Sequence, residues 1–276
     1  MKTDIHHHFI PEIMRAYKPE LPAWTVEDSL RFAGENHLDR IFFSIPSLDI
    51  RFKDQSERKT FCREANRELY TILRKYPDIF RGFGVLPFPD IDNCITELNS
   101  CIRFGFDGLI LFSNTDGIYP SSIEYAGLFE LAEEKRLKVF IHPAEPPLFD
   151  GRIHAGINNT IEFPQEVPRL FSRLIIEDCF EKYPSIGYVL GHGGGHFPFQ
   201  FSKIGKLSYM REAKGNLKIR WGRVLGDVIT KRSRFVEYME NVEIDLFETA
   251  GAAQTAALGE YFKPGKCLYG SNFPFF

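Results

Sequence analysis

Two histidines near the start of the chain, His6 and His8, have the spacing of a metal site. They lie in the segment Thr3-Asp-Ile-His-His-His-Phe-Ile-Pro11, whose apolar residues predict a short strand that ends at the proline. Side chains alternate along a strand, so His6 and His8 share one face, and His7 on the other face is expected to pack rather than bind. Zinc and similar metals bind imidazole nitrogens. A purification tag is the alternative interpretation, but a tag is usually longer and lies in a flexible linker.

Further polar residues fall at the ends of other expected strands. His142 ends the apolar segment 138–142, His192 follows the segment 187–191, and Asn272 follows the segment 267–270. A single histidine in such a place is unremarkable. Of the eight histidines, however, six lie at the ends of three expected strands, and this favours a common centre over a scattered distribution.

The elements that must position these residues are eight short apolar segments that alternate with helical ones. The expected strands cover residues 3–10, 40–45, 80–86, 108–112, 138–142, 187–191, 242–246 and 267–270. Sequences typical of helix starts stand at Thr25–Asp28 and Ser121–Glu124, and residues 54–76 predict a long helix. Strands that alternate with helices indicate a parallel sheet.

Eight such units within about 250 residues predict an α/β fold, a (β/α)8 TIM-type barrel that forms one domain over residues 1–276. The active site of such a barrel lies at the C-terminal ends of its strands. A doubly wound open sheet is the alternative, but the chain has no glycine-rich phosphate-binding turn.

Composition excludes several classes of function. The formal net charge is −3, and nothing in the sequence suggests a partnership with nucleic acid or with an anionic membrane. No apolar run approaches the roughly 20 residues of a membrane helix. The five cysteines are scattered without a CxxC pair, so we expect reduced thiols and a cytoplasmic protein. The 27 phenylalanines indicate a Phe-rich core, with an apolar-walled pocket as the alternative.

Six sequence motifs stand in order along the chain. They are Asp4-Ile-His-His-His-Phe-Ile-Pro11, Gly82-Phe-Gly-Val-Leu-Pro87, Phe140-Ile-His-Pro143, Phe180-Glu-Lys-Tyr-Pro184, Gly191-His-Gly-Gly-Gly195 with Phe197-Pro198, and Tyr269-Gly-Ser-Asn-Phe-Pro274. Together they resemble the amidohydrolase superfamily, in the branch of aminocarboxymuconate-semialdehyde decarboxylase and related aromatic-acid decarboxylases. The segment from Ser56 to Pro147 is similar to the subgroup that includes 6-methylsalicylate decarboxylases.

The resemblance implies a divalent metal ion, Zn²⁺ with Mn²⁺ as the alternative, and a small carboxylic acid as substrate. It implies metal ligation by His6, His8 and His142, and a catalytic acid/base role for His192. The family's last ligand is an aspartate, and Asn272 occupies that position. Because arginine pairs bidentately with carboxylates, the candidates for substrate binding are Arg51 and Arg152, and we add His196, which has no clear family counterpart.

Three functions follow as hypotheses. The first is a metal-dependent carboxy-lyase of secondary metabolism, a non-oxidative decarboxylase of a small aromatic or unsaturated acid such as a salicylate-type acid. The second is a metal-dependent hydrolase of a lactone, ester or amide. The third is a catalytically impaired homologue that acts as a binding partner, because an asparagine brings no negative charge and carries no titrating proton. His192, His196 or a carboxylate such as Glu248 could replace the lost function.

The end of the sequence departs from the family pattern as well. The last expected strand is followed by Phe273, Phe275 and Phe276 and by no eighth helix. Exposed aromatic residues on an uncovered strand favour association, so we expect a partner subunit to cover them, in a homo-oligomer such as a dimer.

Overall fold

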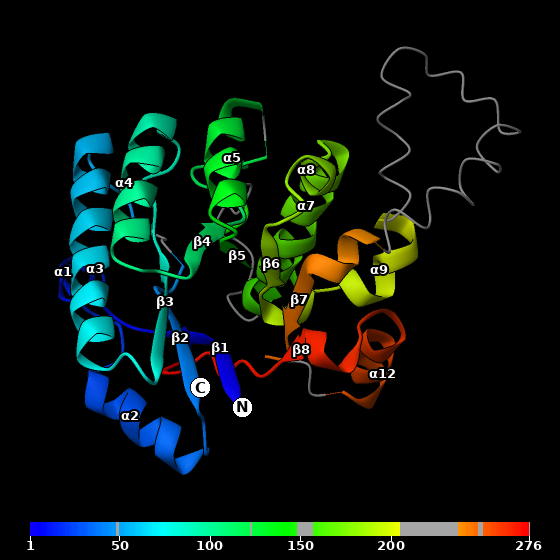
Figure 1. Ribbon diagram of the computed structural model, residues 1–276, viewed down its shortest axis with the longest axis horizontal. Coiled ribbons are helices and arrows are strands. Elements are labelled where there is room, and N and C mark those ends of the chain that lie inside the picture. Colours follow the sequence, from blue (N-terminus) through cyan, green and yellow to red (C-terminus); the bar gives the residue numbers. More distant parts are fainter. Residues whose placement is uncertain (48–49, 122, 148–156, 205–236, 248–250, 276) are drawn as a thin grey trace, which may run out of the picture.

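The computed structural model describes residues 1–47, 50–121, 123–147, 157–204, 237–247 and 251–275. Eight parallel strands lie side by side in the order of the chain, with the helices outside them (Figure 1). This arrangement confirms the predicted (β/α)8 barrel. The strands are β1 (Thr3–His8), β2 (Arg40–Ser44), β3 (Phe80–Gly84), β4 (Gly108–Phe112), β5 (Lys138–His142), β6 (Gly187–Leu190), β7 (Val242–Asp245) and β8 (Cys267–Leu268).

The first and last strands approach one another and nearly close the barrel. The backbone N–H of Ile5 donates to the carbonyl oxygen of Tyr269 at 3.0 Å, and the N–H of His8 donates to that of Phe273 at 2.8 Å. These bonds satisfy backbone groups that an open sheet would leave at its edges. They also bring the segment after β8 next to the histidines of β1.

The helices form the outer layer, with α3, α4 and α5 in a row over one side of the barrel (Figure 1). None of the helices in the described part of the chain is long and apolar enough to span a membrane. Their bounds are α1 (Glu12–Tyr17), α2 (Val26–Glu35), α3 (Gln55–Lys75), α4 (Ile91–Arg103), α5 (Ala126–Glu134), α7 (Phe163–Ile176), α8 (Cys179–Lys182), α9 (Phe197–Ile204) and α12 (Ala252–Tyr261).

Two helix starts that the sequence predicts are capped as expected. Thr25 and Asp28 form the expected reciprocal cap of α2, and Asp54 caps α3. The expected start at Ser121 is wrong, because α5 begins at Ala126 after a single 3-10 turn. The Ser121 hydroxyl donates instead to the carboxylate of Glu177, at the end of α7, at 3.3 Å.

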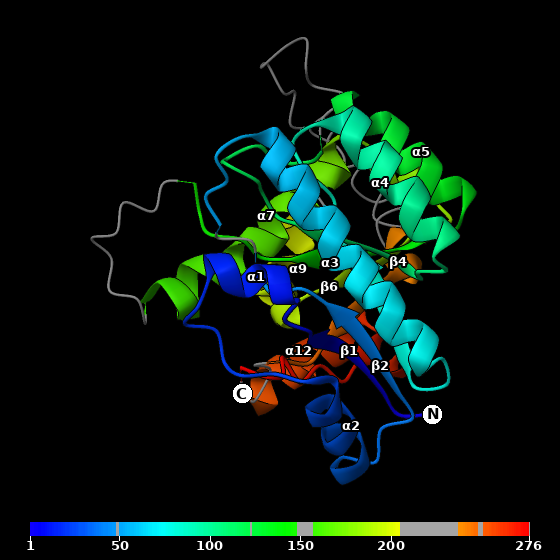
Figure 2. The ribbon, with the colours of Figure 1, turned by 90° about the vertical axis from the view of Figure 1, so that its left-hand side faces the viewer.

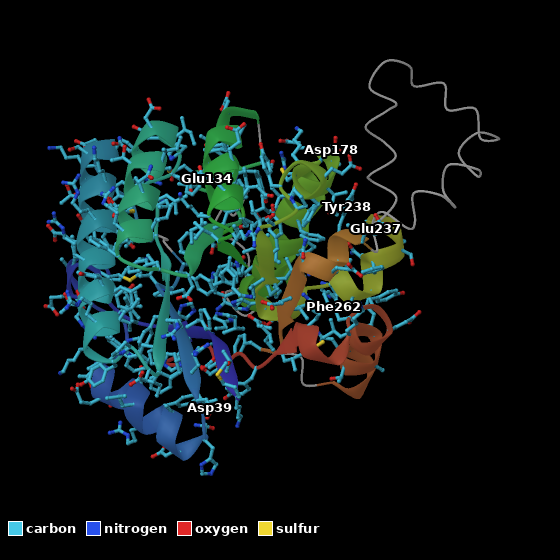
Figure 3. All side chains as sticks on the ribbon, viewed as in Figure 1. Asp39, Glu134, Asp178, Glu237, Tyr238 and Phe262 are labelled. Carbon is cyan, nitrogen blue, oxygen red and sulfur yellow. The ribbon has the colours of Figure 1, made fainter. Side chains whose placement is uncertain are left out.

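Phenylalanine fills the space between the strands and the helices, where Figure 3 shows side chains packed densely. Polar residues such as Asp39 and Glu134 lie outside this layer, while Phe262 is buried against Phe197 of α9. The fully buried phenylalanines confirm the predicted Phe-rich core; they are Phe9, Phe43, Phe61, Phe80, Phe83, Phe140, Phe171 and Phe197.

The aromatic residues after β8 are less exposed than the sequence predicted. The ring of Phe273 stacks on His7 with a centroid distance of 4.9 Å and lies 4.7 Å from the ring of Phe32. Phe275 lies 5.7 Å from the ring of His8. The expectation that Phe273 and Phe275 are exposed is therefore wrong, because the segment folds back over β1 and α2. Phe276 lies outside the described residues.

Candidate active site

Three histidines from two strands converge at the C-terminal end of the barrel. His6 and His8 come from β1 and His142 is the last residue of β5. Their side chains are at most 3% exposed, and one nitrogen of each lies within 4.8 Å of the others. The structure thus brings together the three histidines expected as metal ligands.

The hydrogen bonds around these imidazoles define which nitrogen carries the proton. His6 Nδ1 lies 2.6 Å from Asp245 Oδ2, and His142 Nδ1 lies 2.8 Å from the carbonyl oxygen of Pro143. His8 Nδ1 lies 3.3 Å from the carbonyl oxygen of Ser44. Carboxylate and carbonyl oxygens only accept, so each Nδ1 is the donor. Each Nε2 then carries a lone pair and serves as a ligand.

The Nε2 atoms fit a bound cation. His6 Nε2 and His8 Nε2 are 3.1 Å apart, and two lone pairs at this distance repel each other unless a positive charge lies between them. His142 Nε2 is buried and has no hydrogen-bond partner among the described residues. Such an orphaned buried acceptor is costly unless it binds something. The three donors therefore suit a divalent metal that accepts imidazole nitrogen.

Burial favours the neutral state of His8 and His142. Loss of solvent around His8, together with the neighbouring His6, holds the pKa of its imidazole well below the ordinary value of 6.5. Burial and the neighbouring His192 lower the pKa of His142 in the same direction. Neutral imidazoles are the form that binds metal, so the site is prepared for a cation at neutral pH.

A carboxylate that the sequence analysis missed positions two of the histidines. Asp245, fully buried at the end of β7, accepts the Nδ1 proton of His6 and, with the same Oδ2, the backbone N–H of His192 at 3.1 Å. Its Oδ1 accepts the N–H of Gly193 at 2.9 Å. The sequence does show an acidic residue at the end of an apolar strand. The histidines were identified as polar residues in the same kind of position.

His192 lies beside the three converging histidines. Its ring centroid is 5.1 Å from that of His6 and 5.1 Å from that of His142, and its backbone has a positive φ of 51°. The next turn closely approaches α7, because a Cβ on Gly195 would collide with the carbonyl oxygen of Pro164. His192 thus occupies the place expected of an acid/base next to the site.

Asn272 is held at the cavity by its backbone. Its φ is 52°, in the left-handed region that asparagine tolerates better than most residues, and its N–H donates to the carbonyl oxygen of His6 at 2.7 Å. The side chain is 7% exposed and lines the same cavity as His8 and His142. The residue expected as fourth ligand therefore lies next to the other three.

The buried side chains of Asp4 and His7 on β1 hold the loop that carries Asn272. The buried carboxylate of Asp4 accepts the hydroxyl of Ser271 at 2.6 Å and its N–H at 3.1 Å. Asp4 also lies 2.9 Å from His7 Nδ1, and His7 Nε2 lies 2.9 Å from the Ser29 hydroxyl. His7 points away from the three converging histidines, as its place in the strand predicted.

His8, His142 and His192 line a cavity of about 260 Å³. This size is just below the range of typical small-molecule pockets and suits a ligand with a single small ring. One part of the lining is apolar and contains Met14, Leu21, Pro46, Phe163 and Phe275. The polar part contains His8, Lys18, Glu20, Ser47, His142, His192 and Asn272.

Two of the residues expected to bind substrate, Arg51 and His196, do not line this cavity. Arg51 is exposed and is not among the described residues that line the cavity, and His196 is exposed and contacts Gln165. Arg152 and Glu248 lie outside the described residues. The cation that does line the cavity is Lys18, which follows a short helix that the sequence analysis missed.

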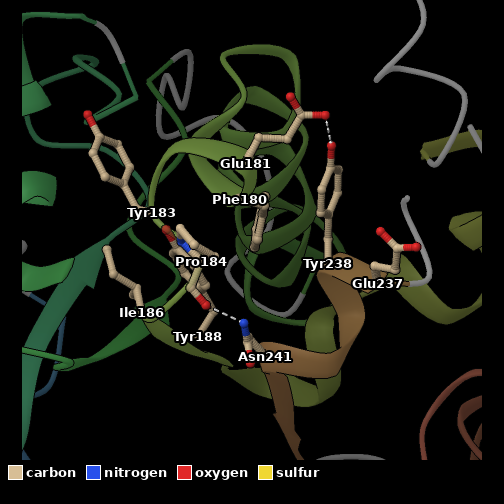
Figure 4. Close-up of a pocket in the computed structure, with 9 residues that line it drawn as sticks. All are labelled: Phe180, Glu181, Tyr183, Pro184, Ile186, Tyr188, Glu237, Tyr238 and Asn241. Carbon is tan, nitrogen blue, oxygen red and sulfur yellow. Dashed lines mark hydrogen bonds between the residues drawn. The ribbon is translucent and has the colours of Figure 1, made fainter. Parts of the chain in front are cut away.

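A larger hollow, of about 420 Å³, lies before β6 and β7 at the opposite end of the barrel (Figure 4). Tyr238 donates its hydroxyl proton to Glu181 there, and Asn241 donates to the carbonyl oxygen of Pro184. Tyrosine and glutamate side chains dominate its described lining, and none of the converging histidines reaches it. The chemistry of the molecule therefore belongs to the smaller cavity.

An eight-stranded parallel barrel carries two histidines on β1, one on β5 and one after β6, and three of them could hold a metal ion. The family model described as amidohydrolase matches residues 3–276. The chain belongs to this family.

Curated relatives and solved structures are consistent with this membership. The decarboxylase macB of Penicillium terrestre is 25% identical over 301 residues, which cover 99% of this chain and 84% of the relative. The 6-methylsalicylic acid decarboxylase acuB of Aspergillus aculeatus is 23% identical over 299 residues, which cover 99% and 84%. A dihydroxybenzoic acid decarboxylase of a Polaromonas species, solved with manganese and the inhibitor 2-nitroresorcinol, shares the fold with a TM-score of 0.79 at 21% identity, over 99% of this chain and 86% of that one.

Proposed function

We propose that this protein is a metal-dependent, non-oxidative decarboxylase of a small aromatic or unsaturated carboxylic acid, such as a salicylate-type acid. The observation that carries the proposal is the convergence of His6, His8 and His142, one ring nitrogen of each lying within 4.8 Å of the others, with His192 beside them in a small cavity. Relatives named as decarboxylases of aromatic acids support it.

The proposed reaction breaks the bond between a ring carbon and its carboxyl carbon. The electron pair stays on the ring carbon, CO₂ leaves, and the ring carbon takes up one proton. A divalent metal at the three nitrogens would supply Lewis acidity towards the oxygens of the substrate.

The residues of the chain contribute positioning and the proton. Asp245 fixes the ring of His6 and the backbone of His192, while Phe163 and Phe275 form apolar walls that exclude water from the ring. His192 holds the proton on its imidazole and delivers it to the ring carbon. A positioned acid of this kind accelerates a reaction by roughly 10²–10⁴-fold.

The metal is proposed to be Zn²⁺, because three imidazoles and one oxygen ligand suit its tetrahedral preference. Mn²⁺ is the alternative, since the Polaromonas enzyme was solved with manganese. Elemental analysis of the purified protein distinguishes the two. The double variant His6→Ala/His8→Ala should bind neither ion, and full occupancy in that variant would refute the proposed ligand set.

The reaction itself is tested with a panel of salicylate-like acids and matched lactones. CO₂ release from the acids supports the decarboxylase, whereas ring opening of the lactones alone would make the protein a hydrolase. His192→Ala should keep the metal and lose most of the turnover. Unchanged turnover would exclude its role as the acid.

Asn272 favours a second candidate, a catalytically impaired homologue that acts as a binding partner. An amide oxygen binds a metal more weakly than a carboxylate and transfers no proton at neutral pH. Metal content and CO₂ release should therefore be compared between the parent and Asn272→Asp. An empty, inactive parent beside a filled, active variant would support the impaired homologue, and a metal-loaded, active parent would exclude it.

A further inference from the structure

Helix α7 carries a buried carboxylate that the proposed reaction does not use. Glu166 is fully buried, which is rare for a glutamate unless it is paired. Its Oε1 lies 3.1 Å from the Nε atom of Arg169. Its Oε2 accepts hydrogen bonds from Tyr119 at 2.8 Å, from Asn114 at 3.0 Å and, at the longer distance of 3.5 Å, from Ser113. All three donors belong to the loop after β4, so this carboxylate ties the loop to α7.

The carboxylate also decides how two of these side chains are oriented. A carboxylate oxygen only accepts, so the amide nitrogen of Asn114 must face Glu166. The same nitrogen donates to the carbonyl oxygen of Glu145 at 3.0 Å. The hydroxyl proton of Ser113 likewise points to Glu166, and its oxygen is left to accept the backbone N–H of Ala144 at 2.9 Å. Glu166 thus orders two contacts to the segment after β5.

That segment carries one of the three histidines expected to bind the metal. The backbone N–H of Ser113 donates to the carbonyl oxygen of His142 at 2.9 Å, so residues 142–145 are held at three backbone groups on both sides of Pro143. The carbonyl oxygen of Pro143 accepts the Nδ1 proton of His142 at 2.8 Å. The direction of this carbonyl group, and with it the ring of His142, therefore depends on the network around Glu166.

The strands alone cannot hold this segment. Strand β4 pairs with β5 only as far as Phe112 and His142, and beyond them side chains take over from the backbone ladder. Helix α7 supplies the support from outside the sheet. Phe163 at its first turn lines the cavity, and Glu166 lies three residues later, on the same face of the helix.

We propose that Glu166 is a positioning residue for the metal site. Through Ser113 and Asn114 it fixes the carbonyl group of Pro143, which holds His142 in the tautomer and direction that present Nε2 to the ion. This inference rests on the proposed function for the identity of the site. It assigns a role to a buried residue that lies outside every sequence motif and does not touch the ion.

The first test is the dissociation constant of the metal, measured by competition with a chelator. Glu166→Gln keeps the shape but replaces one accepting oxygen by a donor. The dissociation constant should rise by about tenfold, the lower end of the range for groups that support a metal ligand, because Glu166 acts at one remove from His142. Ser113→Ala breaks the same link without touching the buried carboxylate and should raise it a few-fold. If Glu166→Gln does not fold, Ser113→Ala carries the test.

The matched control is a carboxylate of the same construction elsewhere in the barrel. Glu97 is 4% exposed on α4, which lies between α3 and α5 (Figure 2). It accepts a hydrogen bond from Asn66 at 2.9 Å, and the amide of Asn66 also donates to the carbonyl oxygen of Val85 at 2.8 Å. This network holds the segment after β3, which carries none of the converging histidines. Glu97→Gln should lower the stability of the protein but leave the metal dissociation constant within about twofold of the wild type.

The second test reads the tautomer of His142 directly in the metal-free protein. Nitrogen NMR of labelled histidines at neutral pH distinguishes a protonated ring nitrogen from a bare one, and His142→Gln identifies the signals of His142. In the wild type Nδ1 should carry the proton. Glu166→Gln should move part of the His142 population to the other tautomer, while His6, which Asp245 holds, keeps its own. A general loss of stability would not separate the two histidines.

Several results would overturn the positioning role. They are an unchanged dissociation constant in both Glu166→Gln and Ser113→Ala, an equal rise in Glu97→Gln, an unchanged tautomer of His142, and an equal change in His6. The NMR comparison needs no metal and no substrate, so it decides the role of Glu166 independently of the reaction. The expected pattern in a protein that releases no CO₂ from any acid would refute the reaction and retain the positioning role.

Discussion

A single carboxylate, Asp245, sets the orientation of two functional histidines. It binds His6 through Nδ1 and His192 through the backbone N–H. It is not in the group of side chains that could hold a metal ion, and both of its oxygens already accept hydrogen bonds from donors of the chain. Its contribution is to fix the tautomer and the direction of the ring of His6.

Asp245→Asn should weaken metal binding by about 10–100-fold, the usual effect of losing such a supporting carboxylate. The amide has the same shape but removes the charge that favours the Nδ1 proton. Competition with a chelator measures the affinity. Asp39→Asn is the control, because Asp39 is 59% exposed and precedes β2, at the end of the strands opposite the site. Equal affinity in Asp245→Asn and the wild type would contradict the positioning role.

Because His8 and His142 are buried, we expect the free energy of unfolding of the metal-free protein to decrease in acid. The folded-state pKa values of His8 and His142 lie well below 6.5, so below that pH the unfolded chain binds protons that the folded chain does not. The free energy of unfolding is then fully retained above pH 6.5 and falls as the pH decreases towards the folded-state values, by about 1.4 kcal/mol per pH unit for each histidine. Urea denaturation at pH 7.5 and 5.5 measures the loss. A variant His8→Gln should lose less stability on acidification, and an equal loss would show that other groups are responsible.

At the level of elements, the strands were predictable, whereas their last residues and the segments between them were less so. Each expected strand exists, because runs of apolar residues between turns are a local signal. Helix α1 was missed because its six residues are too few to show a helical repeat. Lys18, which follows it, was missed for the same reason, whereas Arg51 was chosen by residue type and proved exposed.

The loop after β8 depends on one hydroxyl. Ser271→Ala removes the hydrogen bond to the buried carboxylate of Asp4, and an under-satisfied buried acceptor costs about 1–3 kcal/mol of unfolding free energy. Chemical denaturation checks this value against Ser56→Ala, an exposed serine at the start of α3. A loss of stability no larger than in Ser56→Ala would mean that the loop is held by its backbone alone.

The sequence motifs along the whole barrel resembled one family, but they did not show which side chains are in contact within the barrel. Asp245 and His6 are separated by 239 positions, and nothing local to β7 indicates which histidine its last carboxylate will meet. The homodimer expected from the exposed aromatic residues stays a prediction, with less support now that Phe273 and Phe275 pack against β1. Light scattering measures the mass of the particle.

Removal of the metal should lower the stability of the entire molecule. A ligand that binds only the folded state adds about 2.7 kcal/mol at a free concentration 100 times its dissociation constant. The melting temperature should therefore fall when a chelator is added and recover with excess metal. The double variant His6→Ala/His8→Ala should melt at the same temperature with and without chelator. A chelator effect in that variant would place the ion at another site.

The hydrogen bond between Asp4 and Ser271 joins residues 267 positions apart, and it bears on when the site forms during synthesis of the chain. Synthesis releases His6 and His8 long before Asp245, which follows His6 by 239 positions, and before the loop of Asn272. Until then the two early histidines lack the carboxylate that fixes their protons and the backbone that closes the barrel. A metal ion that bound early would thus find two imidazoles whose orientation is not yet fixed. Tight binding requires the last strand to be in place. We infer that metal uptake in a translating chain reports the completion of the barrel rather than its beginning.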